Sequence, residues 1–289
     1  MSKQKNIRPQ PDPDSELVAL PSNAFVPRRD LDKPPVLETS HLGIDFGGLT
    51  AVEDFSLTIG RTEIAGLIGP NGAGKTTVFN LLTNVYQPTR GNIMLDGYST
   101  AGKSVYQINR MGIARTFQNI RLFSNMSVLD NAKVGLHNAI KENLFSALTH
   151  SFGYRRAERI ANERAMELLD YFGMADMADA QAGSLPYGAQ RRLEIVRALA
   201  TNPHIILLDE PAAGMNPSET EELMENIRRI RDTFQIAVML IEHDMRLVMN
   251  ICEGICVLDH GSIIAKGTPD EIKRNPTVIK AYLGGSTEE

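Results

Sequence analysis

Near-continuous apolar runs of strand length recur along the chain. They lie at positions 63–68, 205–208, 236–241 and 255–258. Runs this short, with almost no polar position, are typical of parallel strands that are buried on both faces. Between the runs, apolar residues recur at helical spacing, as at Ala161, Ala165, Leu168 and Phe172. Gly173 follows that set as an expected helix C-cap. Strands that alternate with helices predict an α/β fold around a mostly parallel central sheet.

A second pattern near the start of the chain predicts a smaller β subdomain. Short strand-like segments, separated by Gly-Gly and Asp-Gly turns, lie at 36–43, 52–59 and 92–95. Turns of this kind predict antiparallel strands. Further along, Ser218 and Glu221 have the spacing of a capping box. They predict the start of a helix that continues through Leu223, Ile227 and Ile230.

The two ends differ from the rest in composition. Residues 1–35 hold seven of the 15 prolines and few large apolar side chains. Such a segment cannot offset its ordering entropy by burial, so we expect a disordered or loosely docked extension. The predicted domain occupies 36–284, and 285–289 form a tail.

Composition excludes several classes of protein. No apolar run approaches the roughly 20 residues needed to span a bilayer, and the first residues hold no apolar stretch of a secretory signal. A net charge of −5 gives no basis for nucleic-acid binding. The two cysteines, Cys252 and Cys256, suit a reducing compartment better than a disulfide scaffold. Without further ligands they are interpreted as small packed residues rather than a zinc site.

The strongest chemical signal follows the first apolar run. It reads Gly69, Pro70, Asn71, Gly72, Ala73, Gly74, Lys75 and Thr76, with Thr77 next. Between a strand and a helix this pattern is a P-loop, whose glycines let backbone N–H groups face one phosphate anion. Lys75, for which we expect no role in a core, should reach the β- and γ-phosphates, and the Thr76 hydroxyl should bind Mg²⁺. The chain is therefore expected to bind a nucleoside triphosphate with Mg²⁺ and to hydrolyse it.

Two carboxylates follow another buried run. Asp209 and Glu210 come directly after 205–208. Ligands of open parallel sheets bind at the carboxyl ends of strands, which is where these groups would lie. Asp209 suits a Mg²⁺ contact, and Glu210 can polarise the attacking water.

These motifs occur in a familiar order, with Gln118 in ARTFQ, LPYGAQRRLEIVRAL from Leu185, the turn AAGMNP, and His243 in IEHD. Over about 36–284 the chain resembles the ATP-binding cassette of ABC transporters. The resemblance implies that Gln118 contacts Mg²⁺ and water, and that His243 lies near the γ-phosphate. It also implies that Phe46 stacks on adenine, that 119–184 form a helical subdomain, and that Tyr187 and Gly188 belong to the signature that binds nucleotide. For Phe46 a core aromatic stays an alternative, and for His243 a hydrogen-bonded histidine at a strand end.

A narrower likeness concerns FGGLTAVEDFSL, the long helical stretch and the ending GTPDEIKRNPTVIKAYLGG. These resemble the ATPases of branched-chain amino-acid importers. Such importers imply a second ATPase subunit, membrane permease subunits and an external binding protein, with the ATPase at the cytoplasmic face of the bacterial inner membrane. The alternative is the ATPase of a lipid or lipopolysaccharide exporter. An ABC ATPase without a transport function is the less favoured third interpretation. Homodimer and heterodimer both stay open.

The chain departs from the family pattern at the signature. The usual Leu-Ser-Gly-Gly-Gln is replaced by residues 185–189, where Pro186 and Ala189 lack the hydroxyl and the amide. Gly188 still offers a backbone donor at a helix N-terminus. An aspartate usual in the next turn is Asn216 here. These changes put in doubt the nucleotide site that this signature completes, and leave the chain's own P-loop site intact.

Other nucleotide-binding classes fit less well. A small-molecule kinase would not need Gln118, the signature segment and His243 in this order. A GTP switch would carry Asn-Lys-x-Asp, and a DNA-repair cassette a long heptad insertion or zinc cysteines; neither is present. Translation-factor cassettes come two to a chain. The basic cluster Arg155, Arg156 and Arg159 indicates a solvated helix face more than a lipid contact.

Overall fold

The computed structural model describes residues 35–136 and 152–284. The expected extension at 1–35 therefore falls almost wholly outside the described residues, as do the tail at 285–289 and part of the helical stretch. Among the described helices, none is both long enough and apolar enough to cross a membrane.

Within the described residues, a six-stranded sheet forms the centre in the order β10-β9-β3-β8-β7-β6. Its strands are β3 (Ile64–Ile68), β6 (Ile113–Arg115), β7 (Ile205–Asp209), β8 (Ala237–Ile241), β9 (Gly254–Asp259) and β10 (Ser262–Gly267). The pairs from β9 to β6 are parallel, and β10 is antiparallel to β9. The prediction of a mostly parallel central sheet is confirmed.

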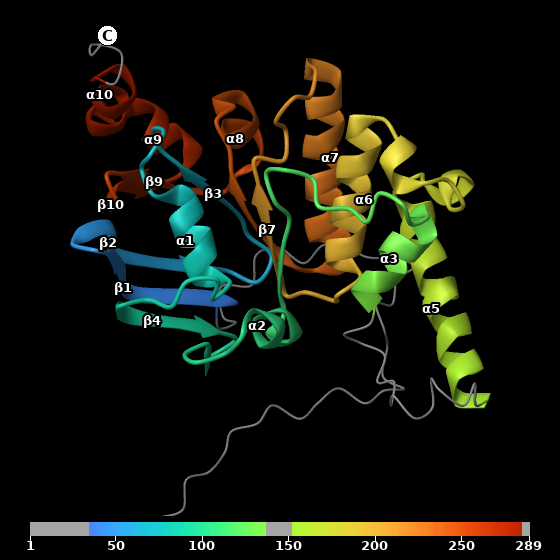
Figure 1. The fold of residues 1–289 in the computed structure, drawn as a ribbon. Coiled ribbons are helices and arrows are strands. Elements are labelled where there is room, and N and C mark those ends of the chain that lie inside the picture. The colour runs from blue at the N-terminus through green and yellow to red at the C-terminus, as the bar shows by residue number, and fades with distance from the viewer. Residues whose placement is uncertain (1–34, 137–151, 285–289) are drawn as a thin grey trace, which may run out of the picture.

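A four-stranded antiparallel sheet, in the order β2-β1-β4-β5, lies beside the central one. It consists of β1 (Leu37–Phe46), β2 (Leu49–Ile59), β4 (Arg90–Leu95) and β5 (Tyr98–Ser99). The helix α1 (Lys75–Leu82) lies between the two sheets (Figure 1), and one core cluster joins its Phe79 to Phe55 of β2 and Leu67 of β3. The predicted antiparallel strands are confirmed.

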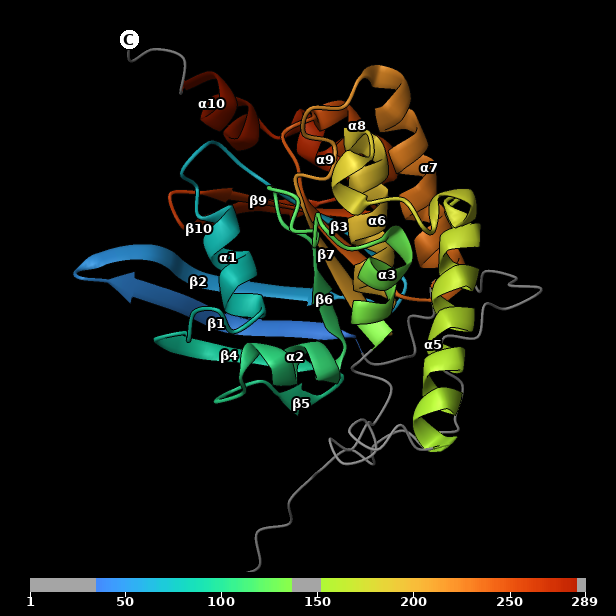
Figure 2. The same ribbon diagram turned by 45° about the vertical axis from the view of Figure 1, so that its right-hand side comes forward.

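Helices lie on the other side of the central sheet, some against it and others packed on those helices (Figure 2). They are α3 (Val128–Leu136), α5 (Phe152–Tyr171), α6 (Tyr187–Leu199), α7 (Pro217–Phe234) and α8 (Met245–Ile251), with the short 3-10 helices η1 (Ala175–Met177) and η2 (Ala182–Ser184). The remaining helices are α2 (Val105–Met111), beside β6 in sequence, and α9 (Pro269–Arg274) and α10 (Pro276–Gly284) at the C-terminal end.

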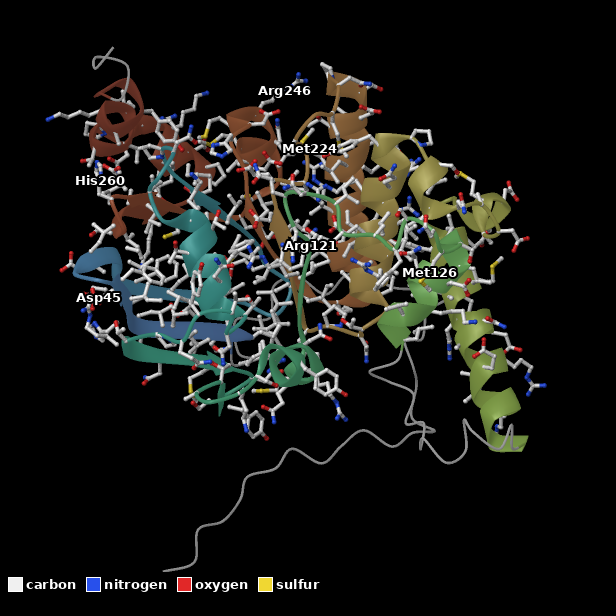
Figure 3. All side chains as sticks on the ribbon, in the orientation of Figure 1. Asp45, Arg121, Met126, Met224, Arg246 and His260 are labelled. Atoms are coloured by element: carbon white, nitrogen blue, oxygen red, sulfur yellow. The ribbon has the colours of Figure 1, made fainter. Side chains whose placement is uncertain are left out.

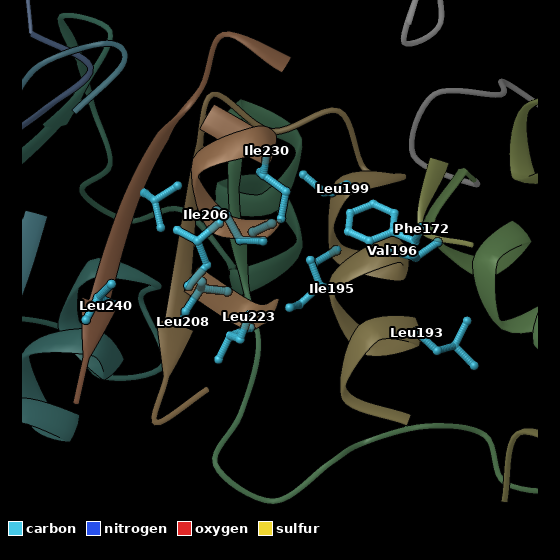
Figure 4. Packing of buried hydrophobic residues seen from close by; sticks show 14 of the residues in the cluster. Phe172, Leu193, Ile195, Val196, Leu199, Ile206, Leu208, Leu223, Ile230 and Leu240 are labelled. Carbon is cyan, nitrogen blue, oxygen red and sulfur yellow. The ribbon is translucent and has the colours of Figure 1, made fainter. Parts of the chain in front are cut away.

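The apolar runs are continuous because the central strands have a core on each face. In β7, Ile205 and Leu207 belong to the cluster around α1, whereas Ile206 and Leu208 belong to the cluster under α6 and α7. Figure 4 shows Ile206 and Leu208 together with Leu223 of α7. Successive side chains of a strand point to opposite faces, so both alternating sets must be apolar here.

The helix that we expected around Ala161 is α5, and the prediction is confirmed. Its residues Ala161, Ala165 and Leu168 are buried, as is Phe172 just beyond its end, and all belong to the main core cluster. Gly173 follows with a φ of 63°, the left-handed conformation of a C-cap. Arg156 and Arg159 are exposed, as expected for a solvated face, whereas the side chain of Arg155 lies outside the described residues.

The predicted start of α7 is wrong by two residues. The capping box pairs Asn216 with Glu219, not Ser218 with Glu221. Asn216 Oδ1 accepts a hydrogen bond from Glu219 N at 3.0 Å, and Glu219 Oε2 accepts one from Asn216 N at 2.9 Å. Pro217 decides the register, because its fixed φ and missing N–H suit the first helical position. The residue before it therefore becomes the N-cap.

This register gives a test with a matched control. Asn216→Ala should lower the free energy of unfolding by about 1 kcal/mol, because it leaves N–H groups of the first turn without their acceptor. Ser218→Ala should change it by less than about 0.5 kcal/mol. Thermal unfolding of the two variants measures this, with an expected fall of about 2–4 °C for the Asn216 variant alone. A larger loss for Ser218→Ala would contradict the observed cap.

Candidate functional site

The loop between β3 and α1 has the conformation that its glycines permit. Gly69 has a φ of 154°, and a Cβ there would lie 2.0 Å from the carbonyl oxygen of Leu258. Gly74, the N-cap of α1, has a φ of 100°, and no side chain caps the helix. The first N–H groups of α1 therefore keep their capacity to bind an anion. A Cβ at Gly72 would meet nothing within 4 Å, so the loop is open on that side.

Lys75 is more buried than expected for a residue without a role in a core. It is 7% exposed, and its Nζ donates hydrogen bonds to the carbonyl oxygens of Gly69 and Pro70, each at 2.8 Å. Burial lowers the pKa of Lys75, while the carboxylates of Glu210 and Asp209 raise it. Because those carboxylates act on the ammonium across the chain, the loop and the end of β7 form one charged site. Thr76, next on α1, is exposed, and Thr77 is half-buried.

Asp209 and Glu210 lie at the carboxyl end of β7, beside β8. Asp209 Oδ2 accepts a hydrogen bond from Arg115 Nη2 at 2.7 Å, and both side chains are nearly buried. Arg115 Nη1 donates to Asn80 Oδ1 of α1, also at 2.7 Å. Arg115 thus connects the helix that follows the P-loop with the aspartate expected to bind Mg²⁺.

Glu210 is the centre of a second set of contacts. Its Oε2 accepts a hydrogen bond from Gln118 Nε2 at 2.7 Å, and its Oε1 lies 2.8 Å from His243 Nε2. The second contact requires the proton on Nε2, because an ionised carboxylate only accepts. Gln118, Glu210 and His243 follow β6, β7 and β8, which are neighbours in the sheet. The structure therefore brings Glu210, selected from its place after a buried strand, together with Gln118 and His243, which the family resemblance implied.

The backbone at Glu210 is strained. Its φ is 46°, in the left-handed region that residues with a side chain seldom occupy. The N–H of Glu210 donates to the carbonyl oxygen of Ile241 in β8 at 2.9 Å, which fixes this conformation from the neighbouring strand. Strain of this kind persists where surrounding contacts determine it, and it concentrates at functional sites.

Phe46 lies at the end of β1 and is 43% exposed, so it is not a core aromatic. Its ring meets that of Tyr86 edge to face, with 5.2 Å between the centroids. Tyr86 is also exposed, and sequence reasoning did not select it. The two rings are nearly perpendicular, at 74°, so each exposed ring offers its own apolar face on which a base can stack.

The signature segment lies apart from this cluster. Pro186 is the N-cap of α6, and Tyr187, at its first position, is 45% exposed. Gly188 is half-buried and Ala189 is buried. The helices α1 and α6 lie on opposite sides of β7 in both views (Figures 1 and 2). Tyr187 and Gly188 therefore do not join the P-loop, Glu210 and His243 within one chain.

Sequence reasoning missed several buried charged residues beside the cluster. Arg115 stood in the motif ARTFQ without a role. Glu242, which precedes His243, accepts hydrogen bonds from the N–H groups of Ala212 and His243 at 2.7 and 3.1 Å. Burial raises the pKa of Glu242, and the N–H groups oppose that shift. The sequence did offer a signal for such residues. It is a charged side chain that stands within or next to a motif and beside apolar positions.

The donor atoms around the loop fit Mg²⁺. The hydroxyl of Thr76, the amide oxygen of Gln118 and the carboxylate of Asp209 are oxygen ligands, the kind that Mg²⁺ prefers. The described residues contain no group of three or more His, Cys, Asp or Glu side chains that could bind a metal ion unaided. Cys252 and Cys256 are buried free thiols, in line with their interpretation as packed residues.

A strand, a glycine-rich loop and a helix N-terminus, with carboxylates at the end of another buried strand of the same sheet, define a P-loop nucleotide-binding protein. The family model described as ABC transporter matches residues 52–213, and one described as branched-chain amino acid ATP-binding cassette transporter matches 262–287. The chain belongs to the ABC transporter family and is one of its ATP-hydrolysing, ATP-binding subunits.

Several relatives share most of their length with it. The high-affinity branched-chain amino acid transport ATP-binding protein BraF of Pseudomonas aeruginosa is 48% identical, over 86% of this chain and 98% of the relative. LivG of Escherichia coli, with the same description, is 49% identical over the same shares. The lipopolysaccharide export system ATP-binding protein LptB of Escherichia coli is 36% identical over 86% and 97%.

A solved structure agrees in fold. The crystal structure of the ADP conformation of an ATP-binding cassette of an ABC transporter is similar with a TM-score of 0.75 and 28% identity. The similarity covers 86% of this chain and 99% of that one. The expected fold class is confirmed.

The geometry of Lys75 gives the next prediction. Lys75→Ala should leave a folded protein whose affinity for ATP falls about 10- to 150-fold, because a charge-assisted hydrogen bond to phosphate is lost. Isothermal titration with ATP measures the affinity, and thermal unfolding monitors the fold. Lys103→Ala, at an exposed lysine outside the loop, is the matched control and should bind normally. Normal binding by Lys75→Ala would remove this residue from the site.

Proposed function

We propose that this protein hydrolyses ATP to power an importer of branched-chain or related amino acids at the cytoplasmic face of a bacterial inner membrane. The observation that carries the proposal is 48–50% identity to ATPases of branched-chain amino acid transport over 98% of their length. The match of residues 262–287 to the model with the same description supports it. The alternative, a lipopolysaccharide exporter ATPase, has the weaker support of 36% identity.

The P-loop residues and Lys75 bind the phosphates of ATP in this proposal. The backbone from Gly69 to Thr77 supplies N–H donors, Lys75 supplies the charge, and Phe46 stacks on the adenine. Thr76, Asp209 and Gln118 bind Mg²⁺, which neutralises charge on the phosphates when it is bound. The domain comprises 36–284, with the helical subdomain at about 119–184.

Glu210 acts as the general base and His243 stabilises the phosphate that leaves. In the structure both oxygens of the Glu210 carboxylate are occupied, one by Gln118 and one by His243. A water molecule that gives up its proton to Glu210 must itself hydrogen-bond to one of these oxygens. When Gln118 turns away, Oε2 of Glu210 becomes open to the attacking water. This makes Gln118 a control point that a partner can act on.

Two cassettes bind two ATP molecules between them, head to tail. The position of α6, across β7 from the P-loop, supports this arrangement, because Tyr187 and Gly188 can then contact nucleotide only in a partner chain. Contacts of the γ-phosphate with both chains close the dimer, and hydrolysis removes them.

The further partners are membrane permease subunits and, through them, a substrate-binding protein. The segment around Gln118 and the helical subdomain receives the permease and transmits the closing motion. With a formal charge of −5 the chain offers no electrostatic surface for nucleic acid, and none is proposed as a partner.

Glu210→Gln tests both the chemistry and the substrate class. The variant should bind ATP normally and lose turnover by about 10²-fold or more, because the amide cannot accept the proton from water. Phosphate release by the assembled transporter measures turnover, and size-exclusion chromatography with Mg-ATP should show longer-lived closed dimers. Cells that carry the variant should lose uptake of labelled leucine. Normal leucine uptake together with defective lipopolysaccharide export would favour the exporter.

The altered signature predicts unequal ATP sites if the partner is a different cassette. One site combines Lys75 and Glu210 of this chain with the signature of the partner. The other site combines the partner's P-loop with this chain's signature, which holds Pro186 and Ala189. A lost hydrogen bond to a charged phosphate is worth about 1.5–3 kcal/mol, or roughly 10- to 150-fold in rate. Glu210→Gln should therefore reduce the ATPase rate of the transporter far more than the equivalent change in the partner. Equal losses would refute the asymmetry. In a homodimer, Pro186→Ser should instead raise turnover.

A further inference from the structure

A fully buried ion pair lies on α6, just beyond the signature segment. Arg191 is 0% exposed and Glu194 is 2% exposed, and Arg191 Nη1 donates to Glu194 Oε2 at 2.7 Å. Placing two charges out of water is costly, and apolar residues of similar volume often stabilise a protein as well or better. The contacts that the pair makes with other segments are therefore the informative feature.

Arg191 binds main-chain oxygens of two segments that meet at the site. Its Nη1 donates to the carbonyl oxygen of Phe117 at 2.5 Å. Its Nη2 lies within hydrogen-bonding distance of the carbonyl oxygens of Gln118, Asp209 and Glu210, at 3.3, 3.4 and 2.8 Å. One guanidinium thus contacts the backbone of both Gln118 and Glu210, whose side chains bond to each other at 2.7 Å.

Glu194 adds donors from the same loop. Its Oε1 accepts hydrogen bonds from the N–H groups of Phe117 and Arg121, at 3.4 and 3.3 Å. Figure 3 marks Arg121 on the segment that leads from β6 to α3. The pair therefore holds the turn that carries Gln118 in two ways. Arg191 binds carbonyl groups of the turn, and Glu194 binds N–H groups of the turn.

From these contacts we propose that Arg191 and Glu194 are positioning residues that couple the signature helix to the hydrolytic centre. The inference rests on the proposed function of Glu210 and Gln118. The helix α6 begins at Tyr187, so a displacement of the signature by a partner moves Arg191 with it. The long bonds at 3.3–3.4 Å break first, and the turn at Gln118 then shifts relative to Glu210. A misplacement of about 1 Å can change a reaction rate by about 10²-fold.

The geometry requires a guanidinium and a carboxylate at these positions. A lysine at position 191 keeps the charge but has no planar fork, so it cannot reach the loop and the end of β7 at the same time. A glutamine at position 194 keeps the shape but replaces one acceptor by a donor. That donor then faces either Arg191 or the N–H groups of Phe117 and Arg121, and one set of bonds is lost.

The experiment compares Arg191→Lys and Glu194→Gln with Leu193→Ala in the assembled transporter. Leu193 is a fully buried apolar residue of the same helix, and its truncation destabilises the core without removing a hydrogen bond. Circular dichroism defines a temperature at which all variants are folded. Steady-state phosphate release then gives kcat and KM, and amide exchange reports on Phe117 and Arg121. If one charged variant does not fold, the other provides the same comparison.

Both charged variants should lose about 10- to 100-fold in kcat with KM for ATP within about three-fold of wild type. Exchange of the Phe117 and Arg121 amides should accelerate, whereas Leu193→Ala should keep both kcat and these amides near wild type. Wild-type kcat in the charged variants, or an equal loss in Leu193→Ala, would overturn the coupling. If the wild-type assembly does not hydrolyse ATP, the proposed function fails, and unchanged amide exchange in both charged variants then overturns this inference separately.

Discussion

Parallel strands that are buried on both faces can carry polar side chains only where they end. In this protein the ends of β3, β6, β7 and β8 meet at one edge of the sheet, and the charged chemistry follows from that constraint. The P-loop follows β3, Glu210 follows β7, and Gln118 and His243 follow the strands on either side of it. The bonds from Gln118 and His243 to Glu210 are consequences of strand order as much as of side-chain type.

Much of this arrangement could be predicted from the sequence because its signals are local. Four consecutive apolar positions, 205–208, identify β7, and the two carboxylates that follow this run must then lie at the carboxyl edge. The glycine spacing of the P-loop likewise predicts one arrangement, a loop whose backbone N–H groups face a phosphate. A one-residue decision, such as which side chain caps α7, was wrong because two plausible capping boxes overlap and Pro217 selects between them.

Contacts between distant segments could not be predicted. Arg115 and Asp209 are 94 positions apart, and no pattern in either segment points to the other. The same holds for Arg191, which is 74 positions from Phe117 and contacts its carbonyl oxygen. Lys75 was expected to reach the phosphates of a nucleotide, and in the structure its ammonium donates to the carbonyl groups of its own loop. The sequence predicted the residues of the site, whereas the distant residues that orient them came from the fold.

The two cysteines have a practical consequence for following this protein in motion. Burial raises the pKa of each thiol to about 12, so near pH 7 both thiols stay protonated and unreactive. Maleimide and iodoacetamide probes will therefore pass over the native residues in the folded chain. A single cysteine introduced at an exposed position can carry a fluorophore or spin label without removal of Cys252 or Cys256. The natural sequence is already a suitable background for distance measurements between cassettes.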